Sequence, residues 1–72
     1  MFTINKKKSI DVKVIKLIDA AHVSISLYDI RSQLQLYSPD LINQAIRGFQ
    51  IHGLIVIDNG IVTRTDKPYT II

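Results

Sequence analysis

The residues from Ser38 to His52 constrain the fold most, because they carry signals for both ends of a single helix. Ser38 is a favoured N-cap, Pro39 suits the first helical position, and Asp40 is an acid in the first turn, where the helix dipole stabilises it. Gly53 suits the left-handed residue that commonly follows a helix. Residues 38–52 are therefore predicted to form one helix.

This predicted helix has an apolar face and a polar face. At helical spacing four apolar side chains fall within an arc of about 100° and are expected to lie in a core: Ile42, Ala45, Ile46 and Phe49. The opposite face carries Asp40, Asn43, Gln44, Arg47 and Gln50. Ile51 falls among these polar residues, so we expect it to pack on a neighbouring element or a partner. Gly48 is expected to mark a close approach to a neighbouring element.

The composition of the polar face leaves two interpretations open. A helix face that is only solvated more commonly carries Lys and Glu, and such a face needs no ligand. The side chains of Asn, Gln and Arg instead have paired donors and acceptors that match the base edges in a DNA major groove. The sequence therefore predicts either a solvated surface or a surface that reads DNA.

The length and composition indicate one small folded domain spanning residues 1–72. The hydrophobic fraction is 47% and the charged fraction 21%, which argues against disorder. The absence of cysteine excludes disulfides and thiolate metal sites. No apolar run approaches the roughly 20 residues of a membrane span, and residues 1–9 lack the apolar stretch of a signal peptide. We expect a cytoplasmic protein without a membrane segment.

The charge balance is mildly basic. Nine basic and six acidic residues give a formal net charge of +3, and three of the bases are consecutive at Lys6, Lys7 and Lys8. A basic balance favours nucleic acid or another anionic surface as the partner, although a solvated lysine run is the alternative. Residues 1–8 are predicted to form an N-terminal arm that begins with a short alternating segment at Phe2 and Ile4.

Two further helices are predicted before residue 38. Residues 9–21 have an apolar stripe at helical spacing, with Ser9 as the expected N-cap. Residues 23–26 alternate and are expected to be extended, available to pair with a later hairpin. Residues 26–34 resemble a capped amphipathic helix that starts at Ser26.

The connections between these elements predict a steep helix crossing followed by a hairpin. Residues 35–37 are too few for anything but a tight turn, and we expect Leu36 to fill the space between the two helices that it joins. Asn59-Gly60 lies between two β-branched runs, which is a strong hairpin signal, so residues 54–65 are predicted to form a hairpin. Residues 69–72 are expected to add a short strand that pairs within the domain or across a dimer.

This order of elements resembles the winged helix-turn-helix domain of small prokaryotic or phage transcription regulators. The similarity spans residues 9–67, and its most specific part is Phe49 to Ile55, an apolar residue and three variable positions followed by Gly-Leu-Ile. It implies an α+β fold of three helices with a small antiparallel hairpin, the wing. Two features depart from the family pattern: Gln35 holds the turn position where many members have glycine, and the wing tip has no basic residue.

The resemblance also implies a function, namely sequence-specific binding of double-stranded DNA by a transcriptional regulator. The helix at 38–52 would enter the major groove, and a homodimer or a partner protein would supply a second half-site. Asp40 would accept from a cytosine or only stabilise the start of the helix. Tyr28, Arg31 and Tyr37 would lie near the DNA backbone. The residues assigned to DNA are Ser38, Asp40, Asn43, Gln44, Arg47, Arg64, Lys67, Lys6, Lys7 and Lys8.

Two alternatives to regulation remain open, and catalysis is not expected. A winged-helix domain can bind protein instead of DNA, or it can serve as an architectural DNA-binding factor in recombination or replication. His22 and His52 each fall at a predicted helix end, where a cation is favourable, so no metal is expected. No nucleophile–base pair or glycine-rich phosphate loop is recognisable, and we expect no enzyme activity, cofactor or small-molecule substrate.

Overall fold

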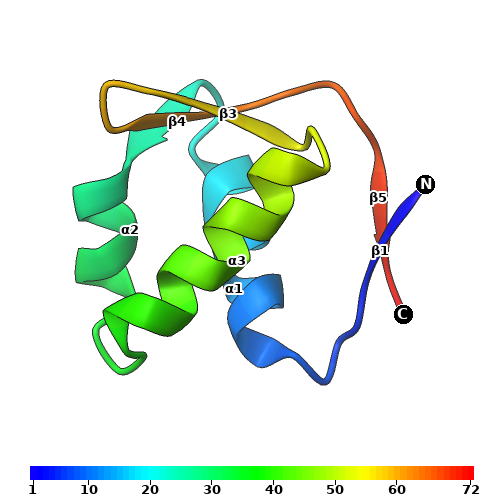
Figure 1. The fold of residues 1–72 in the computed structure, drawn as a ribbon, viewed down its shortest axis with the longest axis horizontal. Coiled ribbons are helices and arrows are strands. Elements are labelled where there is room, and N and C mark those ends of the chain that lie inside the picture. Colours follow the sequence, from blue (N-terminus) through cyan, green and yellow to red (C-terminus); the bar gives the residue numbers. More distant parts are fainter.

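Three helices pack beneath a small antiparallel sheet in the computed structural model, which describes all 72 residues (Figure 1). The helices are α1 (Ser9–Ala20), α2 (Leu27–Gln33) and α3 (Pro39–Ile51). This α+β arrangement of three helices and a small antiparallel sheet confirms the coarse prediction from the sequence. None of the helices combines the length and the apolar character that crossing a membrane requires.

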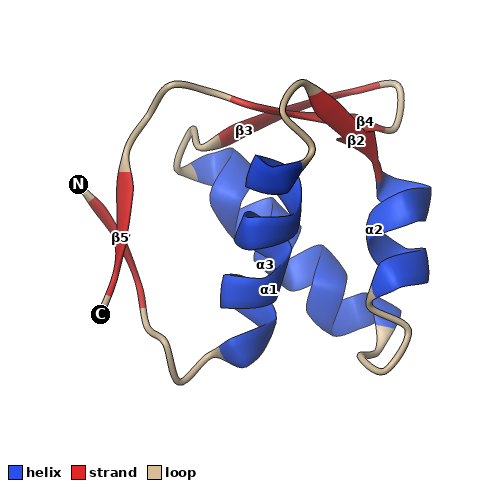
Figure 2. Ribbon diagram, turned by 180° about the vertical axis from the view of Figure 1, so that it is seen from behind, coloured by secondary structure: helices blue, strands red, loops and turns tan.

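The strands form two separate sheets. The first has the order β2–β4–β3 and is antiparallel throughout, whereas the second pairs β1 with β5 in parallel. Figure 2 shows the three-stranded sheet at one end of the helices and the paired chain termini beside them. The strands are β1 (Phe2–Ile4), β2 (Ser24–Ser26), β3 (Ile55–Asp58), β4 (Ile61–Arg64) and β5 (Tyr69–Ile71).

The ends of α1 differ from the prediction. Lys8 is the N-cap and makes no side-chain capping bond, while Ser9 is the first helical residue. The prediction of a Ser9 cap is therefore wrong, and its hydroxyl instead lies 3.4 Å from the Tyr37 hydroxyl. At the other end His22 has a φ of 65°. His22 therefore occupies the left-handed position that glycine usually takes after a helix. This backbone role accounts for His22 better than the predicted role of a cation at the helix end.

The turn between α2 and α3 needs no glycine. Ser26 caps α2 by accepting a hydrogen bond of 3.0 Å from the Asp29 N–H. Gln35 is not left-handed, because His22 and Asn59 are the non-glycine residues with positive φ. The prediction that Leu36 fills the space between the helices is wrong, since its side chain is 99% exposed. Its neighbours on either side, Leu34 and Tyr37, pack against the core instead.

Both end signals of α3 act as the sequence indicated. The Ser38 hydroxyl accepts from the Leu41 N–H at 3.3 Å, and Gly53 has the left-handed φ of 77°. Gly53 is also held by Thr65, whose hydroxyl donates to the Gly53 carbonyl at 2.6 Å. Gly48, however, has no atom within 4 Å of the position that a Cβ would take, so the prediction of a close approach inside the domain is wrong.

The hairpin turns at Asn59 and Gly60, which both have positive φ, as a two-residue type I′ turn requires. Asp58 pairs with Ile61 across this turn. The Leu27 N–H donates to the Gly60 carbonyl at 2.9 Å. The first residue of α2 is therefore tied to the tip of the hairpin.

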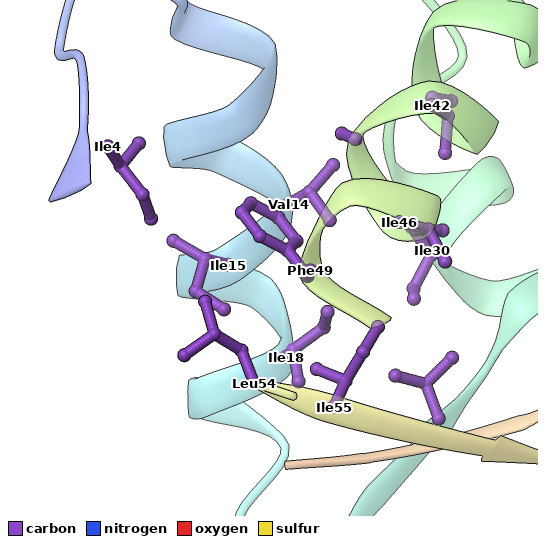
Figure 3. Close-up of a cluster of buried hydrophobic side chains, with 12 residues drawn as sticks. Ile4, Val14, Ile15, Ile18, Ile30, Ile42, Ile46, Phe49, Leu54 and Ile55 are labelled. Atoms are coloured by element: carbon purple, nitrogen blue, oxygen red, sulfur yellow. The ribbon is translucent and has the colours of Figure 1, made fainter. Parts of the chain in front are cut away.

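The core is apolar throughout. All twelve buried residues are hydrophobic, and no polar side chain is buried. Figure 3 shows Phe49 of α3 between side chains from α1 and the strand that follows α3. Each fully buried Ile, Leu or Phe contributes about 1.5–3 kcal/mol relative to an exposed one, so this cluster accounts for much of the stability. The twelve are Ile4, Val14, Ile15, Ile18, Ile30, Ile42, Ala45, Ile46, Phe49, Leu54, Ile55 and Val62.

The two chain ends pair inside the domain. Phe2 pairs with Tyr69 in parallel register, and the Lys6 N–H donates to the Ile72 carbonyl at 2.8 Å. Ile4 is buried, and the Phe2 ring meets the Phe49 ring edge-on at a centroid distance of 6.1 Å. The first residues are thus fixed on the core. The sequence left open whether the terminal strand pairs within the domain or across a dimer, and in this structure it pairs within the domain.

Tyr69 also links the C-terminal strand to α1. Its hydroxyl donates to the Asp19 carboxylate, which accepts a second hydrogen bond from Arg64. Burial of the ring, together with the hydrogen bond to the Asp19 carboxylate and its negative charge, raises the pKa of the Tyr69 phenol above its usual value of 10.

This raised pKa predicts a loss of stability in alkali. The folded protein holds the phenolic proton more tightly than the unfolded chain, whose tyrosine ionises near pH 10. The contribution is fully present below about pH 10 and is lost as the pH rises through the folded pKa. Thermal melts between about pH 9 and pH 11 should show a steeper fall in Tm for the parent than for Tyr69→Phe. Equal slopes would contradict this role.

Candidate nucleic-acid interface

The polar face of α3 is open to solvent. All five of its polar side chains are exposed, while the apolar arc of the same helix is buried. Four of the predicted site residues lie in one groove, between α3, the start of α2 and β3, with Leu27 and Ile57 as apolar walls. Ile51 is 73% exposed, so it packs on no neighbouring element. The four are Asp40, Asn43, Gln44 and Arg47.

Asn43 is held by α2. The Arg31 Nη2 donates to the Asn43 Oδ1 at 2.9 Å. Because arginine only donates, the amide oxygen must face it, and the amide nitrogen keeps both of its hydrogens for another acceptor. A bidentate pair with adenine would have to share this oxygen, so Asn43 is better suited to donating to a base acceptor.

Ser38 lies at the start of the same helix and is exposed. Its oxygen is used in the cap, but its hydroxyl hydrogen remains a possible donor. Asp40 follows in the first turn, where its charge complements the helix dipole. These two residues therefore place one donor and one acidic group at the start of the exposed polar face of α3.

A second groove lies on the other flank of α3. Lys7 and Lys8 line it together with Leu41, Gln44 and Gly48 of α3. Gln44 also lines the first groove, so the two grooves meet on the outward face of the helix. The lysine turn is fixed at its base by the β1–β5 pairing, and all three lysines are exposed.

Arg64 belongs to the interior contacts and not to this surface. Its Nε donates to Asp19 at 2.8 Å, and its Nη1 donates to the carbonyls of Leu54 and Thr65 at 3.0 and 2.7 Å. The guanidinium also lies over the Tyr69 ring, 5.1 Å from its centroid. Three of its five donor hydrogens are therefore engaged within the domain, and Arg64 is not retained among the candidate phosphate contacts.

Lys67 is exposed but lies at the far end of α3. Its side chain passes over Gly53, with the Cδ and Nζ atoms 3.3 Å from the position that a Cβ would take. A cation near a helix C-terminus is electrostatically favourable. Lys67 is thus separated along the helix from Ser38 and Asp40, and the hairpin tip itself carries no basic residue.

The tyrosine before α3 sits in a basic setting. The Lys13 Nζ lies 5.5 Å from the centroid of the Tyr37 ring. The hydrogen bond with Ser9, aided by Lys13, lowers the pKa of the Tyr37 phenol. Tyr28 of α2 is largely exposed.

Sequence reasoning missed two features of this surface. One is the Arg31–Asn43 hydrogen bond, and the other is the meeting of Lys7 and Lys8 with Gln44. Both join residues from different elements, and no local pattern in the sequence signals such contacts. The sequence pointed only to the individual residue types.

The comparisons with known proteins add no assignment to this geometry. No protein-family model, no curated protein and no solved structure matches the chain. The structure also contains no group of three or more His, Asp or Glu side chains placed to hold a metal ion. The surface is therefore interpreted from its own chemistry.

The contacts of Arg64 predict a structural effect without an effect on binding. Arg64→Lys should lower the free energy of unfolding by about 1–3 kcal/mol, because lysine lacks the planar fork that serves Asp19 and two carbonyls. Its affinity for DNA should match the parent. Urea denaturation and duplex titration measure the two effects, with Lys16→Ala as a control that should leave both nearly unchanged, because Lys16 is exposed and lines neither groove. An Arg64→Lys protein with the same free energy of unfolding as the parent would contradict the structural role of Arg64.

Proposed function

We propose that this chain is a small winged-helix protein that binds double-stranded DNA sequence-specifically and regulates transcription. The observation that carries the proposal is that Asn43, Gln44 and Arg47 are exposed together on α3, opposite a fully buried apolar arc. The family resemblance supports it, since the three-helix fold with a small antiparallel sheet is compatible with that family. Such a regulator would act in the cytoplasm of a prokaryotic cell or of a virus host.

The base contacts follow from the chemistry of each side chain. Arg47 would pair with guanine through two donors, and Gln44 would pair with adenine through its amide. Asn43, whose oxygen meets Arg31, would donate its amide nitrogen to an acceptor such as guanine O6 or thymine O4. Each good pair is worth about 1–3 kcal/mol of discrimination.

The phosphate contacts would come from the borders of this surface. Ser38 offers its hydroxyl, and Lys6, Lys7 and Lys8 offer charge from the turn beside α3. With one helix reading only a few base pairs, two copies on paired half-sites would supply the specificity. The net charge of +3 is modest, which also favours a pair of domains.

Salt dependence of binding is the first test. With the three lysines on phosphates, a plot of log K against log salt should have a slope of about −3 for each bound copy. A duplex obtained by selection from random oligonucleotides is the probe, and fluorescence anisotropy is the measurement. A chain that binds no duplex at low salt is not a DNA-binding protein.

The second test addresses base reading. Arg47→Ala should cost about 1–3 kcal/mol on the selected duplex and relax its preference at one base pair. Lys16→Ala is the matched control, because Lys16 is exposed on α1 and lines neither groove. If Arg47→Ala binds every duplex as the parent does, the site assignment is wrong.

One observation favours a second candidate, a protein-binding winged helix. Ile51, the last residue of α3, is 73% exposed on the same side of the helix as the polar residues, and the hairpin tip lacks a basic residue. A protein partner would cover Ile51, whereas a DNA partner would use it against a thymine methyl group. An architectural role in recombination or replication would keep the DNA contacts but show weak discrimination between duplexes.

A further inference from the structure

Gly48 is an unexplained glycine inside a helix. Glycine in a helix interior is destabilising relative to alanine, and it is retained where a backbone or a ligand must come close. Gly53 and Gly60 have positive φ values that account for them, but Gly48 is helical. No atom lies within 4 Å of its missing Cβ, so no contact inside the domain requires it.

The open side of Gly48 faces a groove with mixed chemistry. Gly48 lies about 40° around α3 from Gln44, at the border of the polar face. Leu41 and Ala45 give the groove apolar patches, and Lys7 and Lys8 give it positive charge. Asp11 is its only acid and belongs to the first turn of α1, where its charge is balanced by the helix dipole.

We propose that this groove receives one sugar–phosphate strand of the duplex whose bases α3 reads, with Gly48 leaving room for a deoxyribose against the helix. A nucleic-acid strand alternates apolar sugars with anionic phosphates, which matches the apolar floor and the lysines. Gln44 lines both grooves, so the strand would continue directly from the base-reading surface. This inference rests on the proposed function and adds the path of the backbone.

The backbone of the lysine turn is anchored beside this groove. The Lys6 N–H bonds to the Ile72 carbonyl at 2.8 Å, and the Ile72 N–H bonds to the Ile4 carbonyl at 2.9 Å. Pairing with the C-terminal end of the chain therefore anchors the start of the lysine turn. A turn whose backbone is already anchored loses little loop freedom on binding, which favours affinity.

The test is a pair of substitutions at Gly48 that separates stability from binding. Gly48→Ala should raise the Tm by about 4–8 °C, because alanine favours the helix and no contact opposes it. Gly48→Gln should lower affinity for the selected duplex by about tenfold, because a long side chain fills the strand's path. Ala20→Gln is the control, since it adds the same side chain to an exposed helical position outside both grooves.

Each outcome is decisive. A higher Tm for Gly48→Ala combined with weaker binding by Gly48→Gln, and parent-like binding by Ala20→Gln, supports the strand path. Parent-like binding by Gly48→Gln, in a protein whose Arg47→Ala variant still loses base preference, overturns the strand path and leaves the proposed function standing. A lower Tm for Gly48→Ala shows a structural need for glycine and also overturns it. A parent chain that binds no duplex overturns both proposals.

Discussion

The burial of the apolar arc of α3 is the interaction on which the rest of the structure depends. Phe49 and its neighbours on that arc pack against α1, α2 and the strand after α3, in a core without any polar side chain. Because the two faces of one helix are fixed to each other, burying this arc turns Asn43, Gln44 and Arg47 outward. The candidate surface is thus a direct consequence of the packing.

The three arginines of the chain have three different environments. Arg64 is turned inward to Asp19 and two carbonyls, Arg31 reaches sideways to Asn43, and Arg47 is exposed. Guanidinium groups suit all three uses because they donate in a plane and keep their charge. Only the contacts in the folded chain show which arginine is committed to stability and which is free for a ligand.

The terminal strands give the N-terminal lysines a defined place. The pairing of β1 with β5 brings residues from both chain ends together and seats Ile4 in the core. A lysine run read in isolation resembles a mobile arm, but here it forms a turn beside α3. An ordered turn would lose less loop freedom than a mobile arm if these lysines bound a ligand.

The sequence by itself determined the helices, the hairpin turn and the buried stripe of α3, because caps, turn residues and hydrophobic period are local signals. It could not determine the positions of Leu36, Arg64 and Gly48. Leu36 is exposed because the turn directs it outward, Arg64 is engaged by groups distant in sequence, and Gly48 faces open space. Those outcomes depend on which elements meet in three dimensions, and only the tertiary structure decided them.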